Sequence, residues 1–227
     1  MRYEEYLKTQ LIKLKEAGLI TTQDLPDMDL YIDQVSTVFQ KFLDKLDGSL
    51  ADKYVTKPMI NNYAKRGLIA RPDGKRYTRD HMVMIAMVIY LRSIFKMEDI
   101  SKIMKPLIDN YSSEYDDTIS PELVYSLAQK ATENSRQEFF SGIDESVSVM
   151  KSQIEDTDLA DDQSMEVLVL ILTLAMRAEM EKYLADRLMK VYFEQPEKER
   201  KEKPKKQKVR STEKEKKTKN DSDISEL

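Results

Sequence analysis

The stretch TKPMINNYAKRGLIARPDGKRYT, which begins at Thr56, constrains the fold more than any other part of the sequence. Threonine is a good N-cap residue and proline is tolerated in the first turn of a helix, so Thr56 and Pro58 mark a helix start. Gly67 suits the position after the C-cap, where the backbone needs a positive φ. A short helix over 56–66 is therefore predicted. The Pro-Asp-Gly turn that follows predicts a small basic hairpin over 70–77.

The rest of the chain is predicted to be mainly α-helical. Only 5 glycines and 7 prolines interrupt the 227 residues, and good helix formers are plentiful. Apolar spacing and capping residues predict further helices over 3–17, 30–46, 79–95, within 95–107, 121–155 and 162–193. Helices on both sides of a short helix and a basic hairpin are typical of a winged helix-turn-helix. The predicted organisation is an N-terminal helix (1–24), a winged helix-turn-helix head (25–110), a C-terminal helical region (120–193) and a disordered charged tail (194–227).

Charge is distributed unevenly along the sequence. The net charge is −4, but residues 53–105 hold twelve lysines and arginines against four acidic residues, whereas residues 106–193 hold seven against eighteen. An acidic chain with a pI near 5.4 is not a typical nucleic-acid-binding protein. A basic module inside such a chain is nevertheless what a nucleic-acid-binding head requires.

The helix over 56–66 carries polar side chains that helix propensity does not explain. Asn61 and Asn62 are adjacent in the middle of the helix, although asparagine is a mediocre helix former. Asparagine can pair with adenine or bind phosphate, and nearby cations favour DNA contact. The predicted DNA-contacting residues are Thr56, Lys57, Asn61, Asn62, Tyr63, Lys65, Arg66, Lys75, Arg76, Tyr77 and Arg79. The alternatives that stay open are solvated polar residues, and a Tyr63 ring buried in the core.

These residues support a family resemblance. The segments VTKPMINNYAKRGLI and PDGKRYTRDHMVMIAMVIYLRSIFKMEDISKIM resemble the DNA-binding head of MerR-type regulators. LYIDQV, TKPMINNYAK and KRYTRDHM resemble the bacterial domain-of-unknown-function 1836 family more closely. The resemblance covers roughly residues 25–110. It implies that Tyr63 and the cation after it touch the DNA backbone or brace the recognition helix, and that Arg76 contacts DNA from the wing. Asn61 and Asn62 depart from the MerR pattern, which usually has an arginine and a tyrosine there, and no cysteine metal-sensing loop is present.

Catalytic and metal-binding chemistry finds no support in the sequence. Cysteine is absent, which excludes disulfides, thiolate metal sites and cysteine nucleophiles. His81 is the single histidine, so local packing or capping is its expected role. No phosphate-binding glycine loop, nucleophile elbow or catalytic triad is present. We therefore predict a non-enzymatic protein with no cofactor and no metal.

A cytoplasmic, soluble protein with no membrane partner is predicted. The most apolar run, VLVLILTLAM at 167–176, has roughly half the length of a membrane span. The N-terminus carries Glu4 and Glu5 where an export signal would be apolar.

The 13 methionines cluster in 82–104 and 165–189. They fill a core or line a groove for an apolar ligand or another helix, and both readings stay open.

A sequence-specific transcriptional regulator that binds double-stranded DNA is the function predicted. The helix over 56–66 would enter the major groove and the hairpin over 70–77 would hold phosphates. A homodimer through the C-terminal helices is expected, because one small module binds DNA weakly and the helix over 162–193 is apolar nearly all round. The alternative is a protein-interaction adaptor that docks partners through the basic head and the acidic helical half. An effector-sensing role for residues 121–193 stays open as a further reading.

Overall fold

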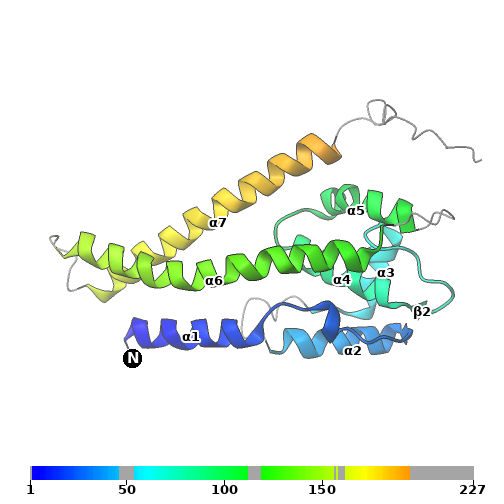
Figure 1. The fold of residues 1–227 in the computed structure, drawn as a ribbon, viewed down its shortest axis with the longest axis horizontal. Coiled ribbons are helices and arrows are strands. Elements are labelled where there is room, and N and C mark those ends of the chain that lie inside the picture. Colours follow the sequence, from blue (N-terminus) through cyan, green and yellow to red (C-terminus); the bar gives the residue numbers. More distant parts are fainter. Residues whose placement is uncertain (1, 46–53, 112–118, 156, 158–161, 195–227) are drawn as a thin grey trace, which may run out of the picture. The chain divides into compact units, whose positions relative to one another are not determined.

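The computed structural model describes residues 2–45, 54–111, 119–155, 157 and 162–194, and these residues are mainly helical (Figure 1). The predicted disordered tail lies almost entirely outside the described residues. In chain order the elements are α1 (Tyr3–Ala17), the 3₁₀ turn η1 (Thr22–Asp24), β1 (Leu30–Tyr31), α2 (Ile32–Leu43), α3 (Lys57–Lys65), β2 (Arg76–Tyr77), α4 (Arg79–Leu91), α5 (Met97–Tyr111), α6 (Pro121–Ile154) and α7 (Gln163–Phe193).

The ends of several helices lie where capping residues predict them. Gly67 follows the C-cap of α3 with φ +67°, a left-handed conformation that glycine adopts without strain. At the start of α7 the Asp162 carboxylate accepts hydrogen bonds from the backbone N–H groups of Ser164 and Met165, at 2.9 and 3.3 Å. The predicted helices over 3–17, 121–155 and 162–193 are confirmed to within one residue at each end.

The predicted hairpin over 70–77 is wrong in its strand pairing. Strand β2 pairs antiparallel with β1, so that Leu30 lies opposite Tyr77 and Tyr31 opposite Arg76. The turn itself is present, because the backbone N–H of Arg76 donates to the carbonyl of Asp73 at 3.3 Å. The residues before this turn, 68–70, are all buried in the core instead of forming the other strand of a hairpin. A strand distant in the sequence is therefore the partner of β2.

Several predicted helix boundaries are also wrong, and the helix predicted over 79–95 ends at Leu91. Leu30 and Tyr31 form strand β1, so α2 begins at Ile32 and not at residue 30. Helix α5 continues through Pro106 to Tyr111, beyond the predicted end at residue 107. Proline removes one backbone donor from a helix, but the Pro106 side chain is exposed and adds no clash with the core.

One hydrophobic core, which we call the head core, extends from Ile20 to Tyr125. Helix α4 lies at its centre, since eight of its thirteen residues are buried. Tyr125 belongs to α6, so the first turns of that helix complete the head core beyond the predicted boundary at residue 110. Its hydroxyl donates to the carbonyl of Ile20 at 2.6 Å, and burial raises its pKa.

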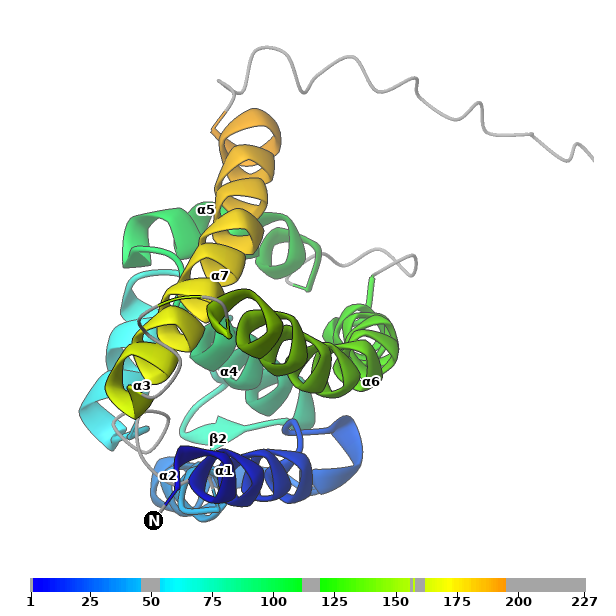
Figure 2. The same cartoon turned by 90° about the vertical axis from the view of Figure 1, so that its left-hand side faces the viewer.

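Helices α1, α6 and α7 meet in a second, smaller cluster. Met150, Ile154 and Leu170 are buried there, and Leu7 of α1 packs against them. Helix α1 lies beside α6 in both views (Figures 1 and 2). A hydrogen bond joins the two helices, because the Arg136 guanidinium donates to the carbonyl of Lys15 at 3.0 Å.

The C-terminal part of α7 extends away from α1 and α2 in both views (Figures 1 and 2). Only Leu170 and Met189 of this helix are buried. Many of its large apolar side chains are exposed, among them Leu168, Ile171, Leu172, Met176, Met180, Tyr183, Leu184, Leu188 and Tyr192. Other described helices of the chain therefore leave much of the apolar surface of α7 uncovered. No described helix is both long and apolar enough to cross a membrane.

Candidate nucleic-acid interface

Helix α3 has one buried and one polar face. Ile60 and Tyr63 are 0% and 1% exposed, while Asn61, Asn62 and Lys65 are all exposed. At about 100° of rotation per residue, the exposed side chains of α3 fall within an arc of about 140°. The polar residues of this helix that were predicted to contact DNA therefore point outward together. The apolar residues hold the helix against the head core.

Side chains from α4 and α5 brace the C-terminal half of α3. The Arg92 guanidinium donates to the Tyr63 hydroxyl at 2.7 Å, and the Ser101 hydroxyl donates to the carbonyl of Arg66 at 3.1 Å. Arg66 also forms an ion pair with Glu98 at 3.2 Å. Since burial raises the pKa of Tyr63, its hydroxyl stays neutral and acts within the head. The geometry thus assigns Tyr63 to bracing and argues against a DNA contact through its hydroxyl. Arg92, which is not among the residues predicted to contact DNA, is the side chain that holds it.

The turn after α3 carries several exposed cations. Arg71, Lys75 and Arg76 are all exposed, and the Arg76 guanidinium lies 5.8 Å from the centre of the Tyr31 ring. Arg71 was not among the predicted DNA-contacting residues. Its place directly before the Pro-Asp-Gly turn is the signal that could have added it. Tyr77, which was among them, is 3% exposed and packs edge to face with His81, so its side chain belongs to the core and not to the interface.

Three of the predicted cations, Arg79 with Glu122 among them, already have acidic partners. Lys57 forms an ion pair with Asp33 of α2, and Arg66 is paired with Glu98. In contrast, Lys65, Arg71 and Lys75 form no ion pair with another described residue. These three cations, with Asn61 and Asn62, are the strongest candidates for a nucleic-acid contact.

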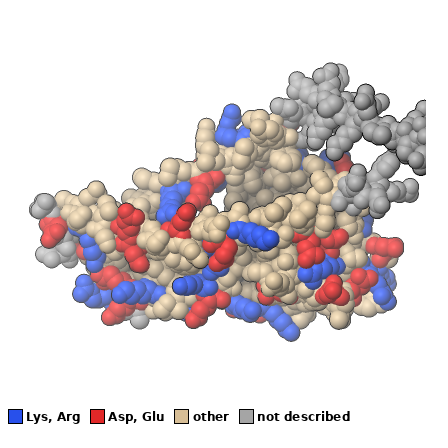
Figure 3. Space-filling view, viewed as in Figure 1, with Lys and Arg blue, Asp and Glu red and all other residues tan. Residues whose placement is uncertain are grey.

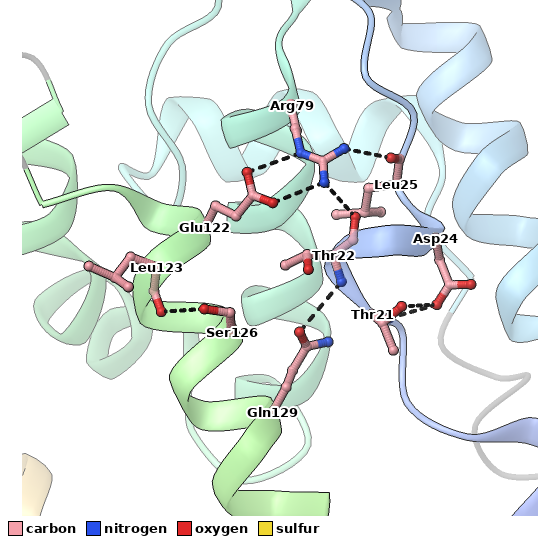
Figure 4. A network of polar contacts seen from close by, with 9 residues as sticks. All are labelled: Thr21, Thr22, Asp24, Leu25, Arg79, Glu122, Leu123, Ser126 and Gln129. Atoms are coloured by element: carbon pink, nitrogen blue, oxygen red, sulfur yellow. Dashed lines mark hydrogen bonds and ion pairs between the residues drawn. The ribbon is translucent and has the colours of Figure 1, made fainter.

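Arg79 is removed from the predicted contact set by its own hydrogen bonds (Figure 4). Its guanidinium donates twice to the Glu122 carboxylate, at 2.9 and 3.0 Å, and once each to the carbonyls of Leu25 and Thr22, at 2.8 Å. The bonds to Glu122 raise the pKa of Arg79 and lower that of Glu122. Four of the five N–H donors of the guanidinium are used in this way, which leaves a single donor for a phosphate. Arg79 joins the start of α4, the start of α6 and the loop around η1.

His81 is buried beside this network. Its Nδ1 accepts from the backbone N–H of Thr78 at 3.2 Å and lies 2.8 Å from the Thr78 hydroxyl. Burial lowers the pKa of His81 and keeps the ring neutral. This arrangement matches the capping role expected from the sequence. Within the described ranges, no cluster of three His, Cys, Asp or Glu side chains could hold a metal ion.

Comparison with known proteins gives a result that agrees with the extent of the head core. No curated protein and no solved structure matches the chain. The model of one protein family does match, over residues 20–127. This segment begins at Ile20 and ends just after Tyr125, as the head core does. Residues 20–127 of this chain are therefore similar to the family described as Domain of unknown function (DUF1836).

Proposed function

We propose that this protein is a dimeric, sequence-specific DNA-binding regulator whose helix α3 lies in the major groove. The observation that carries this proposal is the outward arc of α3, where Asn61 and Asn62 stand beside Lys65. Asparagine offers the bidentate amide that adenine needs, and lysine offers phosphate contact. Helix α2, helix α3 and the small β1–β2 sheet would form the DNA-binding unit, with the exposed turn before β2 serving as the wing.

The cations of the turn support the same proposal. Arg71 and Lys75 lie within a few residues of each other on an exposed turn, and neither is paired with a described acid. Cations held next to a recognition helix neutralise phosphates and fix its register without reading sequence. The division of labour would be base contact by Asn61 and Asn62, and phosphate contact by Lys65, Arg71 and Lys75.

Exposed apolar residues on α7 support a dimer. Leu172, Met176, Met180, Leu184 and Leu188 follow one another at intervals of four residues, and each is at least 48% exposed. Such a row forms a ridge that can pack into the grooves of a second helix. A second copy of the chain would bury this ridge and would place two heads on one DNA site.

The decisive test is selection of genomic DNA fragments by the purified full-length chain at two salt concentrations. A shared inverted-repeat motif retained at the higher salt supports a dimeric, sequence-specific regulator. Uniform retention that disappears with added salt indicates only a basic patch and overturns the proposal.

Paired variants separate the proposed base contacts from the phosphate contacts. Asn61→Ala should relax base preference by about 1–3 kcal/mol at the contacted position, while Asn134→Ala, an exposed asparagine on α6, should leave it unchanged. Lys75→Ala should weaken binding to all sequences alike and reduce the salt dependence, while Lys130→Ala on α6 should not. Equal behaviour within each pair would place the interface elsewhere.

A protein-interaction adaptor is the second candidate, and one observation favours it. Asp33 and Glu98 neutralise two of the head's cations, while the exposed apolar ridge of α7 suits a protein partner. An adaptor would show neither a sequence motif nor a steep salt dependence in DNA binding.

A further inference from the structure

An apolar cavity lies between the head and the C-terminal helices. Its volume is about 580 Å³, and its walls come from α4, α5, the first turns of α6 and the last turn of α7. Met87, Leu91, Ile103, Leu107, Val124 and Phe193 are among the side chains that line it. The space-filling view shows a hollow without charged side chains beneath the C-terminal end of α7 (Figure 3). A volume of this size lies within the range of small-molecule binding sites.

The polar groups in the walls are already hydrogen-bonded. The Tyr90 hydroxyl accepts from the backbone N–H of Ile20 at 2.9 Å, and the Tyr125 hydroxyl donates to the Ile20 carbonyl. The Gln129 amide also donates to that carbonyl, at 2.7 Å. The Thr132 hydroxyl donates within its own helix, to the carbonyl of Ala128. None of the residues that line the cavity carries a charge.

These two observations determine the kind of ligand. A charged or strongly polar group entering the cavity would lose its hydration and find no side chain to replace it, which is costly. An apolar molecule would gain from every wall. We infer that this cavity binds an uncharged, predominantly apolar small molecule.

The cavity is separate from the ridge that the proposed dimer would use. Met189 is 3% exposed and Phe193 lines the cavity, so this side of α7 faces the head. Leu188 and Tyr192 are 59% and 65% exposed, and neither lines the cavity. A second copy on the ridge therefore leaves the cavity available to a small molecule.

The walls of the cavity also hold the helix proposed to read DNA. Arg92, at the end of α4, bonds to Tyr63, and Ser101 of α5 bonds to the carbonyl of Arg66. A ligand that shifts α4 against α5 would move the C-terminal half of α3. The ligand would thus be an effector of DNA binding, a consequence that rests on the proposed function.

Binding of the fluorescent probe N-phenyl-1-naphthylamine to the full-length chain tests the site itself. Saturable binding of one probe per chain is expected, with displacement by 1-decanol at a concentration at least about tenfold lower than by decanoate. Probe binding that does not saturate overturns the site, and equal displacement by the two compounds overturns the uncharged character of the ligand.

Two matched alanine-to-phenylalanine variants on α6 show where the probe binds. Ala128 is an exposed residue that lines the cavity, so Ala128→Phe should fill it and weaken probe binding about tenfold or more. Ala131 is exposed on the same helix but is absent from the lining, and Ala131→Phe should bind the probe like the parent protein. Circular dichroism checks that both variants fold, and Thr132→Phe, also at the rim, replaces Ala128→Phe if that variant does not. Equal loss in the cavity and control variants would contradict the assignment.

Measuring DNA affinity with and without 1-decanol tests the link to α3. A change of several-fold that Ala128→Phe abolishes supports the effector role. Unchanged DNA affinity with intact probe binding overturns the link alone. Probe binding in a protein that selects no DNA motif overturns the proposed function and leaves the ligand site standing.

Discussion

Apolar side chains are buried in the head and exposed on helix α7. Helix α4 buries eight of its thirteen residues, whereas α7 buries only Leu170 and Met189 along 31 residues. Yet α7 contains the most apolar run of the sequence, VLVLILTLAM at 167–176. The hydrophobicity of a helix alone therefore does not show whether the helix lies in the core of its own chain. The head core closes within one chain, while the apolar surface of α7 is the kind of patch that marks an interaction site.

The largest effect is expected from truncating a buried head residue. Leu68 is 0% exposed, so Leu68→Ala should remove apolar contacts and leave a cavity, lowering the unfolding free energy by about 2–5 kcal/mol. Leu172 on α7 is 48% exposed, and at a protein concentration too low for the proposed dimer Leu172→Ala should cost less than about 0.5 kcal/mol. Urea unfolding monitored by circular dichroism measures both. Similar losses of unfolding free energy in the two variants would mean that Leu172 is packed within its own chain as Leu68 is.

The next largest effect is expected at the polar junction between the head and α6. Arg79→Ala would remove the guanidinium donor from the Leu25 carbonyl and the Glu122 carboxylate, and would leave the Thr22 carbonyl only the backbone N–H of Leu25. Because the pair is partly exposed to water, we expect a loss of about 2 kcal/mol, below that of a fully buried ion pair.

Arg71→Ala is the matched control for that variant, since Arg71 is exposed and makes no ion pair with a described residue. Arg71→Ala should weaken DNA binding and leave the unfolding free energy nearly unchanged, whereas Arg79→Ala should lower the unfolding free energy. Nearly equal unfolding free energies for the two variants would show that the junction adds nothing to the stability of the head.

A smaller, pH-dependent effect is expected from His81. Its pKa is lowered by burial, against weaker opposing contributions that include Asp80 and Asp29. In the unfolded chain the ring binds a proton near its ordinary pKa of about 6.5, while the folded protein does not. Stability contributed by the neutral ring is therefore complete above that pH and is lost as the pH falls toward the lower, folded pKa.

Unfolding free energies measured between pH 7.5 and pH 5 should fall on acidification in the parent protein. His81→Gln has no titrating ring, so its decline should be shallower over the same interval, with Asp80, whose pKa is raised by burial, titrating in both proteins. Since this is the only histidine in the chain, parallel profiles would show that its ring is not held neutral.

Much of the helical fold follows from local signals in the sequence. Gly67 and Asp162 mark helix ends through backbone conformation and capping, which depend on a few neighbouring residues. The pairing of β2 with β1 could not be predicted in the same way. A two-residue strand has little periodicity, and the partner of Tyr77 is Leu30, far away in the sequence.

The candidate site was predictable where exposure follows helix periodicity. Asn61, Asn62 and Lys65 are exposed, as the spacing around the anchoring residue Ile60 requires. Arg79 was not predictable, because its partners are two carbonyls and one carboxylate brought together by tertiary packing. A cation beside a turn looks the same in the sequence whether it faces phosphate or the protein's own backbone.

The smallest effect on folding, together with a clear effect on assembly, is expected on the exposed ridge of α7. Leu184 is 62% exposed, so a charge at this position costs a single chain little. In a dimer formed through the ridge, Leu184→Glu would bury an unpaired charge against a second copy and should prevent association. Sedimentation equilibrium measures the change in mass. Lys182→Glu, at an exposed position about 160° around the helix from Leu184, is the control and should remain dimeric.

Protein concentration separates assembly from folding in this variant. If the ridge joins two chains, the stability of the parent protein rises with concentration, because association stabilises the folded state by mass action. Leu184→Glu should remove this concentration dependence and match the parent protein at the lowest concentration. A lower stability of Leu184→Glu at every concentration would instead mean that Leu184 is packed within its own chain. The ridge would then be an extension of the head core, and the head and α7 would not differ in how they bury their apolar side chains.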